Sequence, residues 1–192
     1  DRTRVLAAGL GSTSGASVAP DVSLNVPGFG IATRTVESVF GIAASVPAGV
    51  GWVEVEGIGG PMLVTALAVN PLSGAAAAST LLPGARGTWL MPFFVENAGY
   101  WTGLAILNPT DSGASLELSA YHPAGALIAS VPLTLGGRQG QTRLVSQWIP
   151  SLPAETTGYI VISSAGNISL LAYFGTDDGA SVAAIPFSSI RR

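Results

Sequence analysis

Few side chains in this sequence have the type and spacing that acid–base or nucleophilic catalysis needs. The single histidine, His122, lies in Tyr-His-Pro-Ala-Gly, a segment typical of a hairpin turn. A Ser-His-Asp site needs a nucleophile beside the base, and no Gly-x-Ser-x-Gly motif accompanies this histidine. Glu54 and Glu56 share one face of a predicted strand, where a solvated surface explains them without a glycosidase site. We therefore expect a protein that is not an enzyme.

Oxygen ligands for a cation are offered by Asp177 and Asp178, which precede Gly179. The pair lacks the spaced Asp-x-Asp-x-Asp pattern of a calcium loop, and a turn is the simpler interpretation. Asp111 adds a third carboxylate only if two separate loops meet in space. One histidine and no cysteine do not supply a usual zinc site. The sequence predicts no cofactor, with Asp177 and Asp178 kept as the calcium candidates.

The aromatic pair Tyr100 and Trp101 is the candidate ligand-binding site. Both residues follow Asn97-Ala-Gly99, which indicates a turn. Successive side chains of a strand point to opposite faces, so one of these two rings must point away from the core. Sugar-binding sandwiches stack pyranose rings on such exposed aromatic side chains. Packing within the protein, or a place in a subunit interface, is the alternative role for this pair.

The composition restricts the fold class and the partners. Of 192 residues, 48% are hydrophobic and 10% are charged, and 25 glycines and 13 prolines punctuate the chain, a pattern typical of many short strands joined by turns. All eight basic residues are arginine and the net charge is −3, which argues against a nucleic-acid partner. The sequence has no cysteine, and none of its apolar runs is long enough for a membrane span. Because the chain starts at Asp1 without a methionine, we expect it to be processed from a larger precursor.

An internal repeat organises the sequence. Segments of the first half match segments of the second half in the same order, and the offset changes only where turns are expected. The matched ranges are 6–18 with 104–116, 22–26 with 131–135, 33–36 with 142–145, 51–56 with 158–163, and 81–83 with 184–186, at offsets of 98, 109, 109, 107 and 103. The repeat predicts an all-β chain of two tandem, diverged β-sandwich modules of the immunoglobulin-like kind.

The two copies are unequal in length. Residues 1–85 form the predicted N-terminal module and residues 86–192 the C-terminal one. The second copy has a lead-in strand at 89–95 and an extra hairpin at 120–128 that the first copy lacks, so the N-terminal module looks incomplete. A turn or so of helix is expected within 35–44 and again within 144–149 in the corresponding place of each copy.

The second copy also resembles a known group of proteins. Residues 90–95, 100–111, 158–164 and 182–186 are similar to tandem β-sandwich repeats in large secreted or surface proteins of soil-type bacteria. That resemblance implies an extracellular or cell-surface location and a structural, adhesive or assembly role. It carries over no functional residues.

Two functions from different classes follow from these observations. The first is a non-enzymatic extracellular structural protein, a subunit of a surface polymer or filament that associates through open strand edges. It implies self-association, or association with other surface proteins. The alternative is a carbohydrate-binding or adhesive module that uses Tyr100 and Trp101, with a polysaccharide as its partner.

Overall fold

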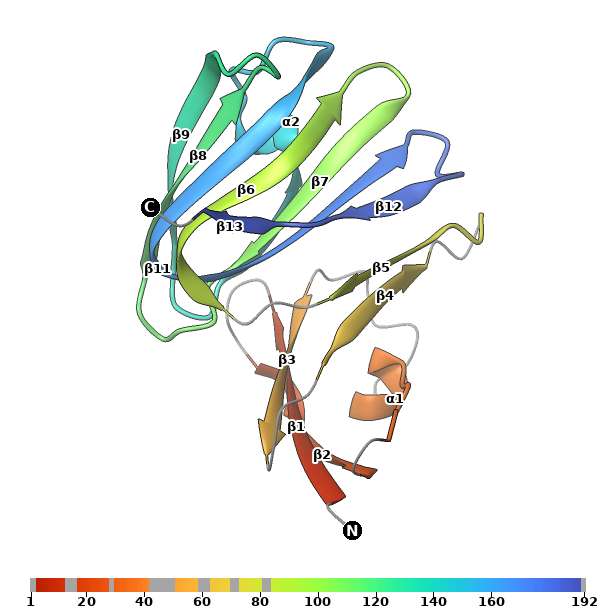
Figure 1. Cartoon of the computed structure of the whole chain (residues 1–192). Coiled ribbons are helices and arrows are strands. Elements are labelled where there is room, and N and C mark those ends of the chain that lie inside the picture. The colour runs from red at the N-terminus through yellow and green to blue at the C-terminus, as the bar shows by residue number, and fades with distance from the viewer. Residues whose placement is uncertain are drawn as a thin grey trace.

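The computed structural model describes residues 3–12, 17–27, 30–41, 51–58, 63–69, 73–80 and 84–190. Strands dominate these residues, with two short helices between them (Figure 1). The strands are β1 (Thr3–Ser12), β2 (Ser17–Pro27), β3 (Gly51–Ile58), β4 (Thr65–Val69), β5 (Ala76–Thr80), β6 (Ala85–Glu96), β7 (Tyr100–Leu107), β8 (Ala114–Tyr121), β9 (Leu127–Leu135), β10 (Gly140–Leu144), β11 (Thr156–Thr176), β12 (Val182–Ile185) and β13 (Ser188–Ile190). The helices are α1 (Val36–Phe40) and α2 (Val145–Trp148). The predicted all-β class and both short helices are confirmed.

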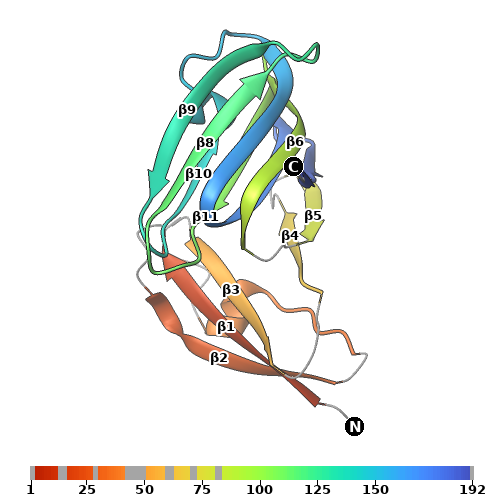
Figure 2. The same ribbon diagram turned by 60° about the vertical axis from the view of Figure 1, so that its left-hand side comes forward.

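The long strand β11 organises the C-terminal part, in which eight antiparallel strands form one sheet. Its first half pairs with β6 and β8, and its second half pairs with β7 and β12. The pairing with β6 shifts register between Ser164 and Ile168, where one half of the strand gives way to the other. The sheet folds over at this strand, and its two halves lie against each other (Figures 1 and 2).

The core lies between the two halves of this folded sheet. In β8, side chains alternate between buried and more exposed, and the predicted inward face of Leu116, Leu118 and Ala120 is buried. Helix α2 contributes Trp148, whose indole N–H donates to the carbonyl of Leu104 at 2.8 Å. Burial on this scale provides the main free energy of folding for the C-terminal part.

The N-terminal part forms two small sheets. One has the strand order β2-β1-β3 and the other is the hairpin β4-β5. Helix α1 begins at the N-cap Thr35, whose hydroxyl accepts from the Ser38 N–H at 3.2 Å, and ends at Gly41, with φ of 64°. A tandem pair of immunoglobulin-like modules is not seen, because these five short strands do not close into a second sandwich. The predicted boundary between residues 85 and 86 stays a prediction.

Polar contacts join the N-terminal part to the C-terminal part. Trp52 of β3 donates its indole N–H to the Arg138 carbonyl at 3.1 Å. The Arg138 guanidinium bonds the Glu54 carboxylate at 2.8 Å. At the other end, the Ser73 hydroxyl donates to the Gly179 carbonyl at 2.5 Å, and β5 packs beside β12. The small N-terminal sheets therefore rest on the loops and one edge of the larger one.

The strand registers relate β1 to β8. Leu6 of β1 pairs with Leu24 and Gly57, and Leu116 of β8 pairs with Leu133 and Ser164. If Leu6 corresponds to Leu116, then Leu24 corresponds to Leu133 and Gly57 to Ser164. The corresponding residues are 110 (116 − 6), 109 (133 − 24) and 107 (164 − 57) positions apart. The last two equal the offsets that the sequence repeat predicts for 22–26 and for 51–56. The offset of 98 expected for residues 6–18 is wrong, because it places β1 on β7, whereas β1 has the neighbours of β8.

Candidate functional site

A β-bulge in β6 builds the main groove of the C-terminal part. Met91 pairs with Ile160 and Phe94 pairs with Gly158, so Pro92 and Phe93 together stand opposite one residue of β11. Proline has no N–H to donate to a sheet, and a bulge is one of the few places where a strand tolerates it. The extra residue lets Met91 and Phe94 both point into the core, while Phe93 turns outward and stays 42% exposed.

In the hairpin formed by β6 and β7, a side chain of β7 hydrogen-bonds to the main chain of β6. The fully buried hydroxyl of Thr102 accepts from the Val95 N–H and donates to the Val95 carbonyl, both at 2.9 Å. The Thr102 N–H in turn donates to a carboxylate oxygen of Glu96 at 3.2 Å. At this position the Thr102 hydroxyl therefore replaces the main-chain hydrogen bonds that would otherwise join β6 to β7. Beyond it the two strands diverge. Aromatic rings fill the gap.

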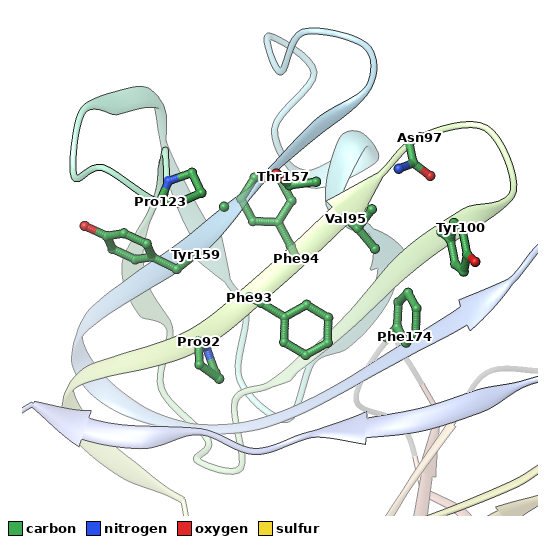
Figure 3. Close-up of a pocket in the computed structure, with 11 residues that line it drawn as sticks. Pro92, Phe93, Phe94, Val95, Asn97, Tyr100, Pro123, Thr157, Tyr159 and Phe174 are labelled. Atoms are coloured by element: carbon green, nitrogen blue, oxygen red, sulfur yellow. The ribbon is translucent and has the colours of Figure 1, made fainter.

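Three rings from three strands meet in this gap (Figure 3). Phe174 of β11 stacks on Tyr100 of β7, with ring centres 5.6 Å apart and planes 10° apart. The Phe93 ring meets Phe174 edge-on at 5.7 Å. On the other side of β6, Tyr159 stacks on Tyr121 at 5.2 Å. These contacts are favourable aromatic geometries, and they fix the positions of the rings.

The groove has a volume of about 740 Å³ and is open to solvent. It is lined by Pro92, Phe93, Phe94, Val95, Asn97, Tyr100, Pro123, Thr157, Gly158, Tyr159 and Phe174. Its polar side chains are amide and hydroxyl groups, with no carboxylate, imidazole or guanidinium among them. This lining suits the binding of a flat or apolar group with a few hydrogen bonds, and it offers no acid–base pair.

Tyr100 and Trp101, the predicted ligand-binding residues, lie on different sides of β7. Tyr100 lines the groove and is 45% exposed. The Trp101 indole N–H donates to the Thr176 carbonyl at 3.1 Å, and its ring lies over Gly103 and Gly175; a Cβ at position 175 would collide with it. The structure therefore does not bring Tyr100 and Trp101 together in one platform, since neighbouring side chains of a strand point to opposite faces.

The predicted calcium candidates stabilise turns. The Asp177 carboxylate accepts from the Gly99 N–H at 3.1 Å, and the Gly99 carbonyl accepts from the Asp177 N–H at 3.0 Å. These bonds clamp the β6–β7 turn, where Gly99 has a φ of 98° that disfavours other residues. Asp178 accepts from the Ala180 N–H at 2.9 Å. Hydrogen bonds from the Thr176 side chain and from Ala180 hold the pKa of the Asp178 carboxyl below its usual value.

The third carboxylate lies elsewhere. Asp111 binds the Arg138 side chain at 2.9 Å, beyond the end of β7 that is opposite to Tyr100 and Asp177. Within the parts of the chain that the structure describes, no group of three or more His, Cys, Asp or Glu side chains is placed to hold a metal ion.

The remaining candidates for chemistry lie apart from the groove floor. His122 lies in the β8–β9 turn, where its main-chain N–H donates to the Ala126 carbonyl at 2.8 Å. Glu54 is bound to Arg138, which makes its carboxylate part of an ion pair. That ion pair, together with the hydrogen bond to Asp111, raises the pKa of the Arg138 guanidinium. Neither His122 nor Glu54 has a second catalytic group beside it among these contacts.

The sequence interpretation missed Phe93, Phe174 and Tyr159 as groove residues. Proline inside the strand-like run 89–95 was the available signal, since a proline there indicates a bulge. The approach of β7 and the second half of β11 to that bulge is a tertiary feature, and no local pattern contains it.

No described helix is long and apolar enough to cross a membrane.

Comparison with known proteins finds matches among solved structures, where 14 chains match. No protein family and no curated protein matches the sequence. Among solved structures, the Anabaena sensory rhodopsin transducer is 20% identical with a TM-score of 0.41, and the match covers 47% of this chain and 98% of that chain. Thermotoga maritima 1070 is 13% identical with a TM-score of 0.42, and that match covers 57% and 93%. These values are too low to transfer any property to this chain.

The expected resemblance to tandem repeats of bacterial surface proteins is corrected by these matches. The two solved structures named above, a sensory rhodopsin transducer and a Thermotoga protein, are not surface repeat modules. The short motifs that suggested the group, such as Leu-Asn-Pro-Thr and Ala-Ile-Pro, mark strand ends and turns. Such motifs recur in unrelated β proteins because turn chemistry selects the same residues. The chain is therefore assigned to no family, and its function has to be argued from its own strands and groove.

Proposed function

We propose that this protein is a non-enzymatic assembly module that associates with polypeptides through its open strand edges. The observation that carries this function is the state of the N-terminal sheets, which have three and two strands. A two-stranded sheet such as β4–β5 is marginally stable without further packing. The edges of the N-terminal sheets also present rows of N–H and C=O groups that can pair with another chain.

The groove supports binding over catalysis. Its lining contains phenols, hydroxyls and one amide, and the nearby Asp177 carboxylate is engaged in the β6–β7 turn.

Sedimentation over a wide range of protein concentration tests this function. We expect the mass to rise with concentration, and we expect amide exchange in the outer strand β2 of the N-terminal part to slow as it rises. Strand β8 of the C-terminal part serves as the internal reference, because it pairs on both sides, with β9 and with β11. A chain that stays monomeric at high concentration and forms no fibres by microscopy would refute self-assembly.

A second candidate function is carbohydrate binding in the aromatic groove. The observation that favours it is the pair of exposed rings, Phe93 and Tyr100, that pack on either side of Phe174. Stacking of a sugar ring on Tyr100 then gives affinity, and Asn97 and Thr157 offer hydrogen bonds.

A glycan array distinguishes this candidate from assembly alone. We expect binding to be lost in Tyr100→Ala and retained in Tyr100→Phe, because the ring provides the contact. Trp101→Ala is the matched control, since this tryptophan lies on the other side of β7. Equal loss in Trp101→Ala, or no glycan bound by the unaltered chain, contradicts the groove as a sugar site.

A further inference from the structure

We propose that the N-terminal part is an acceptor for a β-hairpin of a partner polypeptide, which takes the place that β6 and β7 occupy in the C-terminal part. This inference rests on the proposed function in one respect, namely that open strand edges of this chain are binding surfaces. It adds which edges bind and what pairs with them.

The first half of the acceptor is the free edge of β3. Glu54 of β3 pairs with Gly9 of β1, just as Val161 of β11 pairs with Ser119 of β8. Val161 has a second neighbour, Leu90 of β6. Within the described strands, β3 pairs only with β1. The edge of β3 that faces away from β1 therefore corresponds to the position of β6.

The second half of the acceptor is the edge of β4. In the N-terminal part, the antiparallel hairpin β4–β5 follows β3 along the chain. In the C-terminal part, the second half of β11 forms an antiparallel pair with β12, and this pair follows the first half of β11 in the same way. The second half of β11 pairs with β7 as well as with β12. Among the described strands, β4 pairs only with β5. Since β6 and β7 form one hairpin, a single hairpin supplies both missing neighbours.

Exposed apolar side chains mark the surface that such a hairpin would cover. Val36 of α1 is 44% exposed, whereas its counterpart Val145 of α2, at the same offset of 109 (145 − 36), is 0% exposed. Helix α2 packs against both β6 and β7, which accounts for the burial of Val145. The N-terminal helix has its apolar residue in the same place without that cover.

The same difference appears in the strands. Val53 and Val55 of β3 are only half-buried, whereas their counterparts Ile160 and Ile162, at the offset of 107, are fully buried. Leu67 of β4 is also largely exposed. An amphipathic hairpin that places apolar side chains over these residues would remove them from water, which is the main driving force of association.

The donor is a partner polypeptide and not a second copy of this chain. The hairpin of the C-terminal part carries core side chains, since Met91 and Leu104 are fully buried and Phe94 and Ile106 nearly so. A copy could lend this hairpin only by unfolding its own C-terminal part. The occupant we infer is therefore a separate hairpin with the same alternation of apolar and polar residues.

Hydrogen exchange with a defined probe tests the acceptor. The probe is a synthetic peptide of residues 85–108, added to the intact chain. We expect exchange in β3 and β4 to slow on the order of tenfold when the free peptide is at about ten times its dissociation constant. Exchange in β8 and β9 should stay unchanged, which shows that the C-terminal part is not disturbed.

A matched peptide with Trp89→Pro, Leu90→Pro, Leu104→Pro and Ala105→Pro is the control. Successive N–H groups of a strand point to opposite edges, so proline at two successive positions removes a donor that faces the acceptor. This peptide should give no slowing. A chain with residues 85–108 fused before Asp1 through a flexible linker supplies a second measurement, in which β3 and β4 should be protected without added peptide.

The outcomes separate this inference from the proposed function. Absence of slowing in β3 and β4 with both the peptide and the fusion overturns the acceptor, even if the chain associates through other edges. Slowing that depends on chain concentration alone, without peptide, identifies a second copy as the occupant and overturns the partner hairpin. A monomeric chain that binds the peptide upholds the acceptor while refuting self-assembly.

Discussion

The buried hydroxyl of Thr102 offers a direct test of how the groove is built. It bonds both the N–H and the C=O of Val95 at 2.9 Å, and the residue is fully buried. We predict that Thr102→Val lowers the free energy of unfolding by about 2–3 kcal/mol, because each hydrogen bond contributes roughly 0.5–1.5 kcal/mol and partly buried backbone groups are left unpaired. Thr102→Ser keeps the hydroxyl and loses one methyl group, at a cost of about 1 kcal/mol.

Urea denaturation followed by tryptophan fluorescence measures this difference. The valine variant should unfold at lower urea with an unchanged slope, and its melting temperature should fall by about 4–12 °C for a chain of this size. Thr157→Val is the matched control, because Thr157 pairs with Val95 from β11 but is exposed, and it should change stability by less than about 0.5 kcal/mol. If the valine variant is as stable as the serine variant, the hydroxyl does not tie β6 to β7.

Three further outcomes follow from buried or hydrogen-bonded groups. Trp148→Phe removes the indole N–H that donates to the buried Leu104 carbonyl at 2.8 Å, so we expect a loss of about 1–3 kcal/mol in urea denaturation, and no loss would contradict the bond. Ile160→Val removes one methylene from a fully buried side chain and should cost about 0.5–1.5 kcal/mol, measured in the same way. The pKa of the Asp178 carboxyl is held below its usual value by Thr176 and by a backbone N–H, so its stabilising effect is present above the unfolded pKa and lost as the pH falls through the folded pKa. Asp178→Asn should therefore flatten the acid side of the stability curve, and an unchanged pH dependence would show that this carboxyl is not linked to folding.

Local sequence patterns predicted the elements of the C-terminal part well. The alternation at Leu116, Leu118 and Ala120 predicted one buried face of β8, and that face is buried. Alternation predicts the buried face because successive side chains of a strand point to opposite faces, so apolar residues at every second position lie on one face. The helices at 36–40 and 145–148 lie where a turn of helix was expected, and the strand registers reproduce the predicted offsets of 109 and 107.

The first segment of the repeat shows the limit of such patterns. Residues 6–18 share Ser-Gly-Ala-Ser with 104–116, yet β1 takes the neighbours of β8 and not the place of β7. Loop tetrapeptides are selected by turn geometry, which many loops share, so they align segments poorly. Strand pairing is set by which faces can be buried together, and that depends on the whole sheet.

The sequence by itself determined an all-β chain, the positions of its main strands and short helices, and the scarcity of groups for acid–base chemistry. Those features depend on residue types and on periods of two or three to four residues, which the linear chain contains. Only the tertiary structure decided that the bulge at Pro92 and Phe93 meets Phe174 and Tyr100, and that Trp101 lies on the other side of β7. It also decided that, among the described strands, β3 pairs only with β1 and β4 only with β5, because the pairing of strands far apart in sequence depends on the packing of the complete sheet.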